Sequence, residues 1–229
     1  VLEMPPALAL ELESASGDFE TADLTGPQRL ETTSGDVEVR GAASAISIGT
    51  TSGDVSVSGL GRARVRSVSG DVTVQGVRGP LVVSTTSGGI QVSDAADSLA
   101  LSSISGDIEL DRAPRGLDVG STSGTIRVTG PAEGSVHVRS TSGDVELQLG
   151  RAVRRVEVNT VSGEVGVRLA DGQSCDLALR STSGTLDASV PIRIRTMTRH
   201  ELYGTVSGGG VPVSLHSVSG DITVSGEGR

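Results

Sequence analysis

Aromatic residues are almost missing from this chain of 229 residues: Phe19 and Tyr203 are the only two, and tryptophan does not occur. Globular cores usually obtain much of their buried area from aromatic side chains. The composition therefore predicts a thin core that is built from aliphatic residues.

Lysine is absent too, so all 19 basic side chains are arginine, and 28 acidic side chains outnumber them. The formal net charge is −9. Proteins that bind nucleic acids present basic patches and aromatic stacking platforms. We therefore expect no nucleic-acid partner.

Cysteine occurs once, as Cys175, which excludes an internal disulfide and leaves the redox compartment open. No apolar run approaches the ~20 residues of a membrane-spanning helix, so we expect no direct membrane span in this chain. A signal peptide is not visible either. Because the chain starts at Val1 rather than at methionine, we interpret it as trimmed or processed, which leaves room for an upstream signal or anchor.

What the chain does have is a repeat. Twelve of its Ser-Gly pairs form a series, first in steps of 17 to 19 residues and then in steps of 20, 21, 24 and 12. Their glycines are Gly17, Gly35, Gly53, Gly70, Gly88, Gly106, Gly124, Gly143, Gly163, Gly184, Gly208 and Gly220. A fixed period in this range indicates one small structural unit stacked on copies of itself, and its run from end to end indicates a single domain.

Each repeat is predicted to contain two short strands. Counting from the glycine of the Ser-Gly pair as position zero, positions −7, −5, +2 and +4 are apolar in most units, as Ile46, Ile48, Val55 and Val57 are around Gly53. Such alternation is typical of β-strands. Position −3 is Ser or Thr in all twelve units, and its parity places it on the inward face, where we expect the hydroxyl to satisfy turn amides.

Eighteen residues cannot bury an apolar face alone, but stacked units can pair equivalent strands in parallel, ~4.8 Å apart. We therefore predict an all-β, single-domain β-solenoid of about 12 coils with ~18 residues per coil and two or three parallel sheets. Residues 1–9 are predicted to form an N-terminal lead-in or cap, whose Pro5 and Pro6 would discourage edge pairing. Residues 10–229 form the solenoid, with irregular coils and a loop at 185–210.

An aspartate follows the Ser-Gly pair in many units, and its carboxylate suits a turn because it can accept turn amides. A row of such residues is also a candidate Ca²⁺ ladder, as in calcium β-rolls, but Gly89, Thr125, Thr185 and Gly209 break it. Rows of threonine raise ice binding as a further alternative. We prefer the turn interpretation and expect no metal site and no cofactor.

Catalytic patterns are weak. The three histidines are isolated, and no G-x-S-x-G elbow is present. Two carboxylate pairs, Glu109 with Asp111 and Glu11 with Glu13, are candidates for glycoside chemistry. Since no aromatic platform would hold a sugar, we interpret them as solvated surface charge, and we expect no catalytic residue.

Two groups of residues are candidates for docking a partner. The segment from Pro191 to Tyr203 interrupts the repeat, and the local stripe around Arg64 is either a solvated face beside acidic neighbours or a docking patch. The candidate docking residues are Arg193, Arg195, Arg199, His200, Tyr203, Arg62, Arg64 and Arg66.

The repeated unit, as in the TSGDVSVSG stretch at 51–59, resembles the DUF4097 family, whose members are labelled adhesins. The resemblance covers roughly residues 10–229. It implies a right-handed β-helix in bacterial envelope proteins, usually behind a signal or membrane segment. It implies no established activity, and the family supplies no catalytic residue to transfer.

The leading hypothesis is a non-enzymatic, adhesin-like binding or scaffold module of the bacterial cell envelope that acts through protein–protein contacts. It would lie in the periplasm or at the cell surface, with membrane association through an upstream segment or a partner. The alternative is an accessory structural subunit of a larger membrane-associated complex, and a third hypothesis is a hydrolase of the solenoid type.

Overall fold

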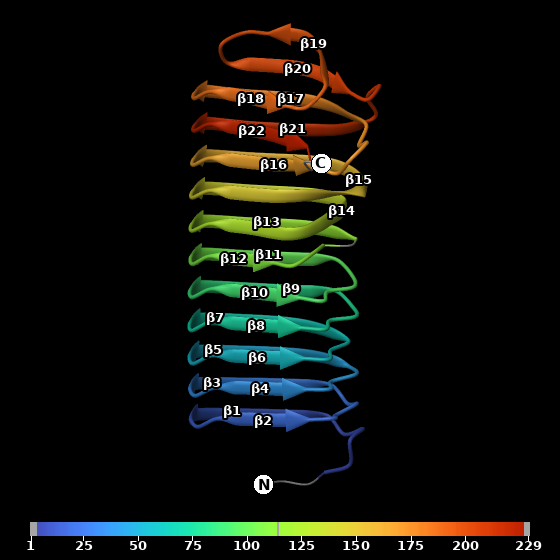
Figure 1. Cartoon of the computed structure of the whole chain (residues 1–229). Coiled ribbons are helices and arrows are strands. Elements are labelled where there is room, and N and C mark those ends of the chain that lie inside the picture. Colours follow the sequence, from blue (N-terminus) through green and yellow to red (C-terminus); the bar gives the residue numbers. More distant parts are fainter. Residues whose placement is uncertain (1–3, 114, 227–229) are drawn as a thin grey trace.

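The chain winds into a stack of flat coils (Figure 1). The computed structural model describes residues 4–113 and 115–226, which form a parallel β-solenoid in which no helix occurs. The predicted fold class is confirmed. Each coil contributes one strand before the Ser-Gly turn and one strand after it, and these build two rows that we call the long row and the short row.

The long row precedes the turns. Its strands are β1 (Leu10–Ser16), β3 (Gln28–Ser34), β5 (Ala45–Ser52), β7 (Arg62–Ser69), β9 (Leu81–Ser87), β11 (Leu99–Ser105), β13 (Gly116–Ser123), β17 (Cys175–Ser183) and β21 (Val211–Ser219).

The short row follows the turns. Its strands are β2 (Phe19–Ala22), β4 (Val37–Arg40), β6 (Val55–Ser58), β8 (Val72–Gln75), β10 (Ile90–Ser93), β12 (Ile108–Leu110), β16 (Val165–Leu169), β18 (Leu186–Ser189) and β22 (Ile222–Gly226). Two longer strands, β14 (Ile126–Ser142) and β15 (Val145–Ser162), continue from the short row into the long row of the next coil.

Equivalent residues of successive coils stack directly. In the long row Leu12 of β1 pairs with Leu30 of β3, which pairs with Ile48 of β5. The same in-register parallel pairing repeats through β15 and β16, so about nine turns of ~18 residues follow in sequence order. Register is strongly specified because a slip by one residue would move every apolar side chain to the outer face.

Beyond β16 the order in space departs from the order in sequence. Strand β21 pairs with β15 on one side and with β17 on the other, and β22 lies in the same way between β16 and β18. The coil of β17 and β18 therefore lies two levels above the coil of β15 and β16, and the later coil of β21 and β22 occupies the level between them (Figure 1). This intercalation returns Gly220 to the column of turn glycines, between Gly163 and Gly184.

The predicted number of 12 coils is slightly too high. The Ser-Gly pair at Gly208 does not close a coil: it follows a hairpin of β19 (Ile192–Met197) and β20 (Glu201–Val206). Strand β20 pairs antiparallel with β17 and covers its outer edge. Most of the region 185–210, expected as irregular coils and a loop, is thus strand structure.

The core is a narrow aliphatic column between the two rows, as predicted. Leu30, Ile48 and Leu81 of the long row and Ile90 and Ile108 of the short row are fully buried. A third inward position, which lies in the connecting loops and, for Ala132, within β14, closes the open side. Its residues are Leu24, Ala42, Leu60, Val77, Ala95, Ala113 and Ala132.

The Ser or Thr at position −3 is buried in most units, as its parity predicts. Its hydroxyl does not satisfy an amide in most turns: Thr32 donates to the carbonyl oxygen of Ser34 at 3.1 Å, and Thr85 donates to that of Ser87 at 3.2 Å. The carbonyl oxygen of Ser34 also accepts the amide of Gly17 in the coil below, at 2.9 Å, so it receives two donors.

The close approach of the coil below requires glycine at the turn. A Cβ at Gly106 would lie 2.1 Å from the carbonyl oxygen of Gly88 in the coil below, and its φ of +143° is one that other residues rarely adopt. We expect Gly106→Val to lower the free energy of unfolding by more than ~4 kcal/mol. Val128→Ala, which only opens a small cavity, should cost about 2 kcal/mol.

Urea unfolding monitored by circular dichroism checks both values. Gly120→Val is the matched control, because a Cβ at Gly120 would contact nothing within 4 Å and its φ is not left-handed. Equal urea midpoints for Gly106→Val and Val128→Ala would contradict this account of the turn.

Candidate functional site

The candidate docking residues lie in two separate places. Arg62, Arg64 and Arg66 are on β7, whereas the Pro191–Tyr203 group forms β19, part of β20 and the turn between them. Eight pairing steps separate β7 from β20 along the stack, or roughly 38 Å at the usual strand spacing. The two groups therefore do not form one surface.

The arginines of β7 project from the outer face of the long row. All three are exposed, and they alternate with the buried residues Ala63 and Val65. None of the three forms an ion pair with a described residue.

The expected acidic neighbours are not there. Strand pairing places Arg64 between Ser47 of β5 and Val82 of β9. Arg66 lies in the same way between Gly49 and Ser84. The stripe is solvated, but the residues that pair with Arg64 and Arg66 on the adjoining strands are uncharged, because the repeat length sets which residues adjoin β7.

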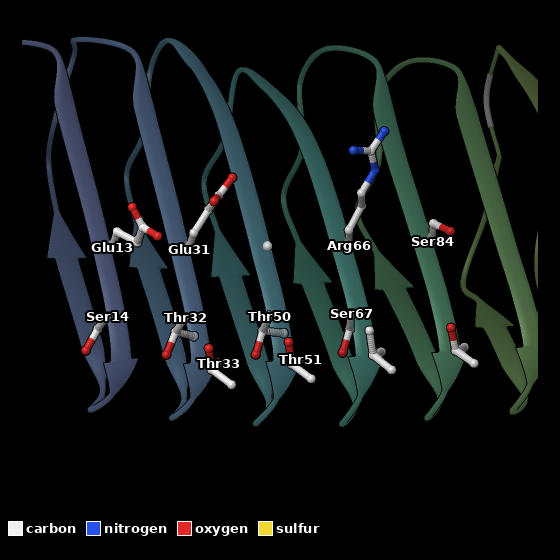
Figure 2. Close-up of a pocket in the computed structure, with 13 residues that line it drawn as sticks. Glu13, Ser14, Glu31, Thr32, Thr33, Thr50, Thr51, Arg66, Ser67 and Ser84 are labelled. Carbon is white, nitrogen blue, oxygen red and sulfur yellow. The ribbon is translucent and has the colours of Figure 1, made fainter.

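A shallow hollow of about 470 Å³ opens on this face across β1 to β9. Figure 2 shows Glu13 and Glu31 on one side of it and Arg66 and Ser84 on the other. Gly49, at the same repeat position on β5, leaves the space between them. Threonines at position −2 line the end of the hollow nearest the turns.

Charge on this face is graded along the stack. Arg29 of β3 is hydrogen-bonded to Glu31, with 2.5 Å between Nη2 and Oε1, and its Nε lies 3.7 Å from Glu11. Glu13 forms neither an ion pair nor a hydrogen bond with a described residue. The face thus runs from acidic at β1, through neutral at β5, to basic at β7.

Sequence reasoning missed Glu13, Glu31 and Gly49 as parts of a surface. The signal was available: position −4 of successive repeats reads Glu13, Glu31, Gly49, Arg66 and Ser84. These residues come together only when the same position of successive repeats is compared, and no local motif contains them.

The Pro191–Tyr203 group is occupied in capping the stack. Tyr203 accepts a hydrogen bond from Arg180 of β17, with 2.5 Å between Nε and Oη, and the same nitrogen lies 3.3 Å from Glu201. His200 Nδ1 lies 3.2 Å from the carbonyl oxygen of Ser181, and Arg195 lies 4.0 Å from Asp176.

The remaining residues of this group are exposed. Arg193 lies on β19 and Arg199 in the turn that follows it. The segment as a whole is part of the fold, because Leu202 and Val206 of β20 enter the core with 2% and 5% of their surface exposed. The segment is therefore mostly strand structure that joins the core, rather than the expected loop.

The aspartates after the turns form a ladder of hydrogen bonds between coils. The amide of Asp54 donates to Asp36 at 2.9 Å, and the amide of Asp71 donates to Asp54 at 2.8 Å. The prediction that these carboxylates accept turn amides is confirmed, and the amide belongs to the next coil up. In the last such coil, the amide of Thr185 donates to the carboxylate of Asp221 at 2.7 Å.

A metal ladder has no support in this geometry. Within residues 4–113 and 115–226, no group of three or more His, Cys, Asp or Glu side chains is arranged to hold an ion. One oxygen of each ladder carboxylate is already directed at an amide.

One member of each carboxylate pair considered for hydrolysis, Glu11 or Glu109, lies beside an arginine on an outer face. Glu109 of β12 is 3.9 Å from Arg127, whose other partner is Glu146 at 3.1 Å. Exposed ion pairs of this kind contribute up to ~1 kcal/mol each. Solvated and paired surface charge accounts for these residues.

Cys175 is buried in the core at the start of β17. Burial, together with the nearby Asp176 carboxylate, raises the pKa of the thiol to about 11. The thiol is therefore protonated at neutral pH and is a poor nucleophile.

In the part of the chain that the structure describes, no helix is long and apolar enough to cross a membrane.

The chain matches the model of a known protein family. The family model described as Toastrack DUF4097 matches residues 6–76 and 62–225. No curated protein and no solved structure matches the chain.

The ladder predicts a pH dependence. Hydrogen bonds from the backbone amide and then the hydroxyl of Thr185 lower the pKa of Asp221. A lowered folded-state pKa gives stability that is present above the unfolded value of ~3.9 and is lost as pH falls through the folded value. Asp221→Asn should therefore be less stable than the native chain at pH 7, and the two urea midpoints should converge below pH 4.

Asp171→Asn is the control for this measurement, because Asp171 lies in an exposed turn without a hydrogen bond to a described residue. Its midpoint should follow the native curve at every pH. A constant gap between native and Asp221→Asn from pH 7 to pH 3 would contradict the ladder.

The capping hairpin is also testable. Leu202→Ala should lower the free energy of unfolding by about 2–4 kcal/mol, because it removes a buried side chain from the last level of the core. Arg199→Ala, in the exposed turn of the same hairpin, should change it by less than ~0.5 kcal/mol. Chemical denaturation measures both, and similar small losses would show that the hairpin does not cap the core.

Proposed function

Since this chain belongs to the Toastrack DUF4097 family, we propose that it is a non-enzymatic binding or scaffold module whose β-solenoid presents a rigid face to a protein partner. The proposed contact surface is the outer face of the long row across β1 to β7. The free arginines of β7 are the observation that carries the proposal. A place outside the cytoplasm, in the bacterial cell envelope, is part of the proposal and is supported by the resemblance of the repeat.

Rigidity supports a binding role. Each strand from β3 to β7 is hydrogen-bonded to a neighbour on both sides, so the backbone beneath this face has little freedom. A surface that is ordered before binding loses less conformational entropy when a partner docks.

The charge pattern supports a protein partner. Arg64 and Arg66 lie about two strand residues, or ~7 Å, apart on a flat sheet, and neither pairs with an acidic residue on the adjoining strands β5 and β9. Arginine is enriched at the energetic centres of protein interfaces. Acidic groups spaced along an extended or flat surface would meet both guanidinium groups at once.

The carboxylates support a role without catalysis. Glycoside hydrolases set two carboxyl groups on either side of a bound sugar. Here Glu31 and Glu11 share Arg29 on an open sheet face, and Glu109 lies beside Arg127.

Site-specific photo-crosslinking in the producing cell tests the proposal. A photoreactive residue at Ser47, on the outer face of β5, should give a discrete protein adduct. The adduct should fall at least fivefold when Arg64→Glu and Arg66→Glu are combined with it, because the arginines supply the attraction. Ser56, exposed on β6 of the short row, is the matched control position.

Failure of the proposal has a clear form. Either no adduct forms at Ser47, or adducts of equal yield form at Ser47 and Ser56. Both results would mean that this face is not a preferred contact surface.

A further inference from the structure

We propose that the partner of this face is a second copy of the chain, docked around a twofold axis that runs parallel to the strands between β3 and β5. The inference rests on the proposed function of the face and deepens it. Rotation about such an axis keeps the position along each strand and reverses the order of the coils. It therefore places β1 over β7 of the second copy, and β3 over its β5.

The charges match under this rotation. Glu13 of one copy faces Arg66 of the other, because both occupy position −4 of their repeats. Glu11 faces Arg64 in the same way at position −6. A twofold interface presents the same patch on both sides, so each pair occurs twice. Four acid–arginine contacts thus arise from one patch. Within the fold, Glu13, Arg64 and Arg66 form no ion pair with a described residue, and Glu11 lies 3.7 Å from Arg29.

The shapes match as well. The rotation sets Glu31 of one copy against Gly49 of the other. The Glu31 side chain thus enters the hollow that exists because Gly49 has no side chain. Position −2 brings no charges together, because Thr33 faces Thr51 and Ala15 faces Val68.

Gly49 has no other explanation within the chain. Its φ is not left-handed, and a Cβ built there would make only an ordinary contact of 3.6 Å with Cγ of Glu31. Glycine inside a strand weakens it and often marks a place where another group approaches closely. The fold tolerates a side chain at Gly49, but the proposed interface does not.

The area sets the strength of the contact. Four strands at ~4.8 Å spacing, each contributing about seven residues at ~3.3 Å, cover on the order of 450 Å² per copy. The total of about 900 Å² is at the lower end for specific interfaces, which is typical of weak, transient association. Because its charges are exposed in the free chain, the dimer should be sensitive to salt.

Two charge-reversal variants test the pairing. Variant A carries Arg64→Glu and Arg66→Glu, and variant B carries Glu11→Arg and Glu13→Arg. Each should remain monomeric alone, because like charges then face each other. An equimolar mixture of A and B should dimerise, since all four contacts are complementary again.

Sedimentation velocity from 10 to 500 μM, at 50 and 500 mM NaCl, provides the readout. The native chain should dimerise, with a Kd that rises at least tenfold between the two salt concentrations. Arg154→Glu with Arg155→Glu, on exposed residues of β15 outside the patch, makes the same change in charge and should leave the Kd unchanged.

The hollow has its own matched pair of variants. Gly49→Arg should weaken the dimer at least tenfold, whereas Gly120→Arg should not, although Gly120 occupies the same repeat position on β13. Circular dichroism and urea midpoints confirm that each variant is folded. This pair keeps the test valid if a charge-reversal variant fails to fold.

Three results would overturn the inference: a native chain that stays monomeric at 500 μM, a dimer that variants A and B leave intact, or a mixture of A and B that does not associate. A monomeric chain whose Ser47 crosslinks to a different protein would reject the second copy and keep the binding function. An acidic peptide or other polyanion would be recognised by its loss in variant A and its retention in variant B.

Discussion

Hydrogen bonds between equivalent strands of successive coils are the constraint on which the rest of the structure depends. A coil of about 18 residues buries too little apolar surface to be stable alone, so its two strands gain their stability only by pairing with the coils above and below. The pairing must be in register, because the apolar column between the two rows exists only when every level points the same residues inward. Close approach of the coils at the turns is what reserves position zero for glycine, as the short distance at Gly106 shows.

The same constraint organises the outer surface. Each repeat position becomes a straight row of side chains, one per coil, so neighbours on the surface are about 18 residues apart in sequence. Across the sheet, Arg66 lies beside Gly49 and Ser84, which belong to the preceding and the following repeat units. A gradient from Glu13 to Arg66 along one row is a property of the stack, and no single unit contains it. This is why a rigid repeat protein can carry a recognition surface without a cleft.

Both ends of the stack are closed by segments that do not follow the repeat. At the start, the carbonyl oxygen of Pro6 accepts the amides of Thr25 and Gly26, at 2.7 and 3.0 Å, which ties the lead-in to the first coil. At the other end, β20 pairs antiparallel with β17 and satisfies its outer edge. Thr185 replaces aspartate in the last coil, where no further turn amide of the ladder remains to be accepted. Uncovered strand edges invite other chains, so such closures limit uncontrolled growth of the sheet.

The sequence by itself determined the repeat, the strand alternation, the parallel solenoid and the aliphatic core, because each follows from local periodicity and from the small size of the unit. It also determined the role of the turn aspartates and the outward direction of Arg62, Arg64 and Arg66, which parity fixes. It did not reveal that β21 and β22 return to a level between β15 and β17, because the spacing of Gly220 fits any level of the column equally well. Nor did it reveal that residues 192–206 form a capping hairpin, or that Glu13, Gly49 and Arg66 share one hollow. Those features depend on which strand edge is left unpaired and on which coils adjoin, and only the assembled stack decides both.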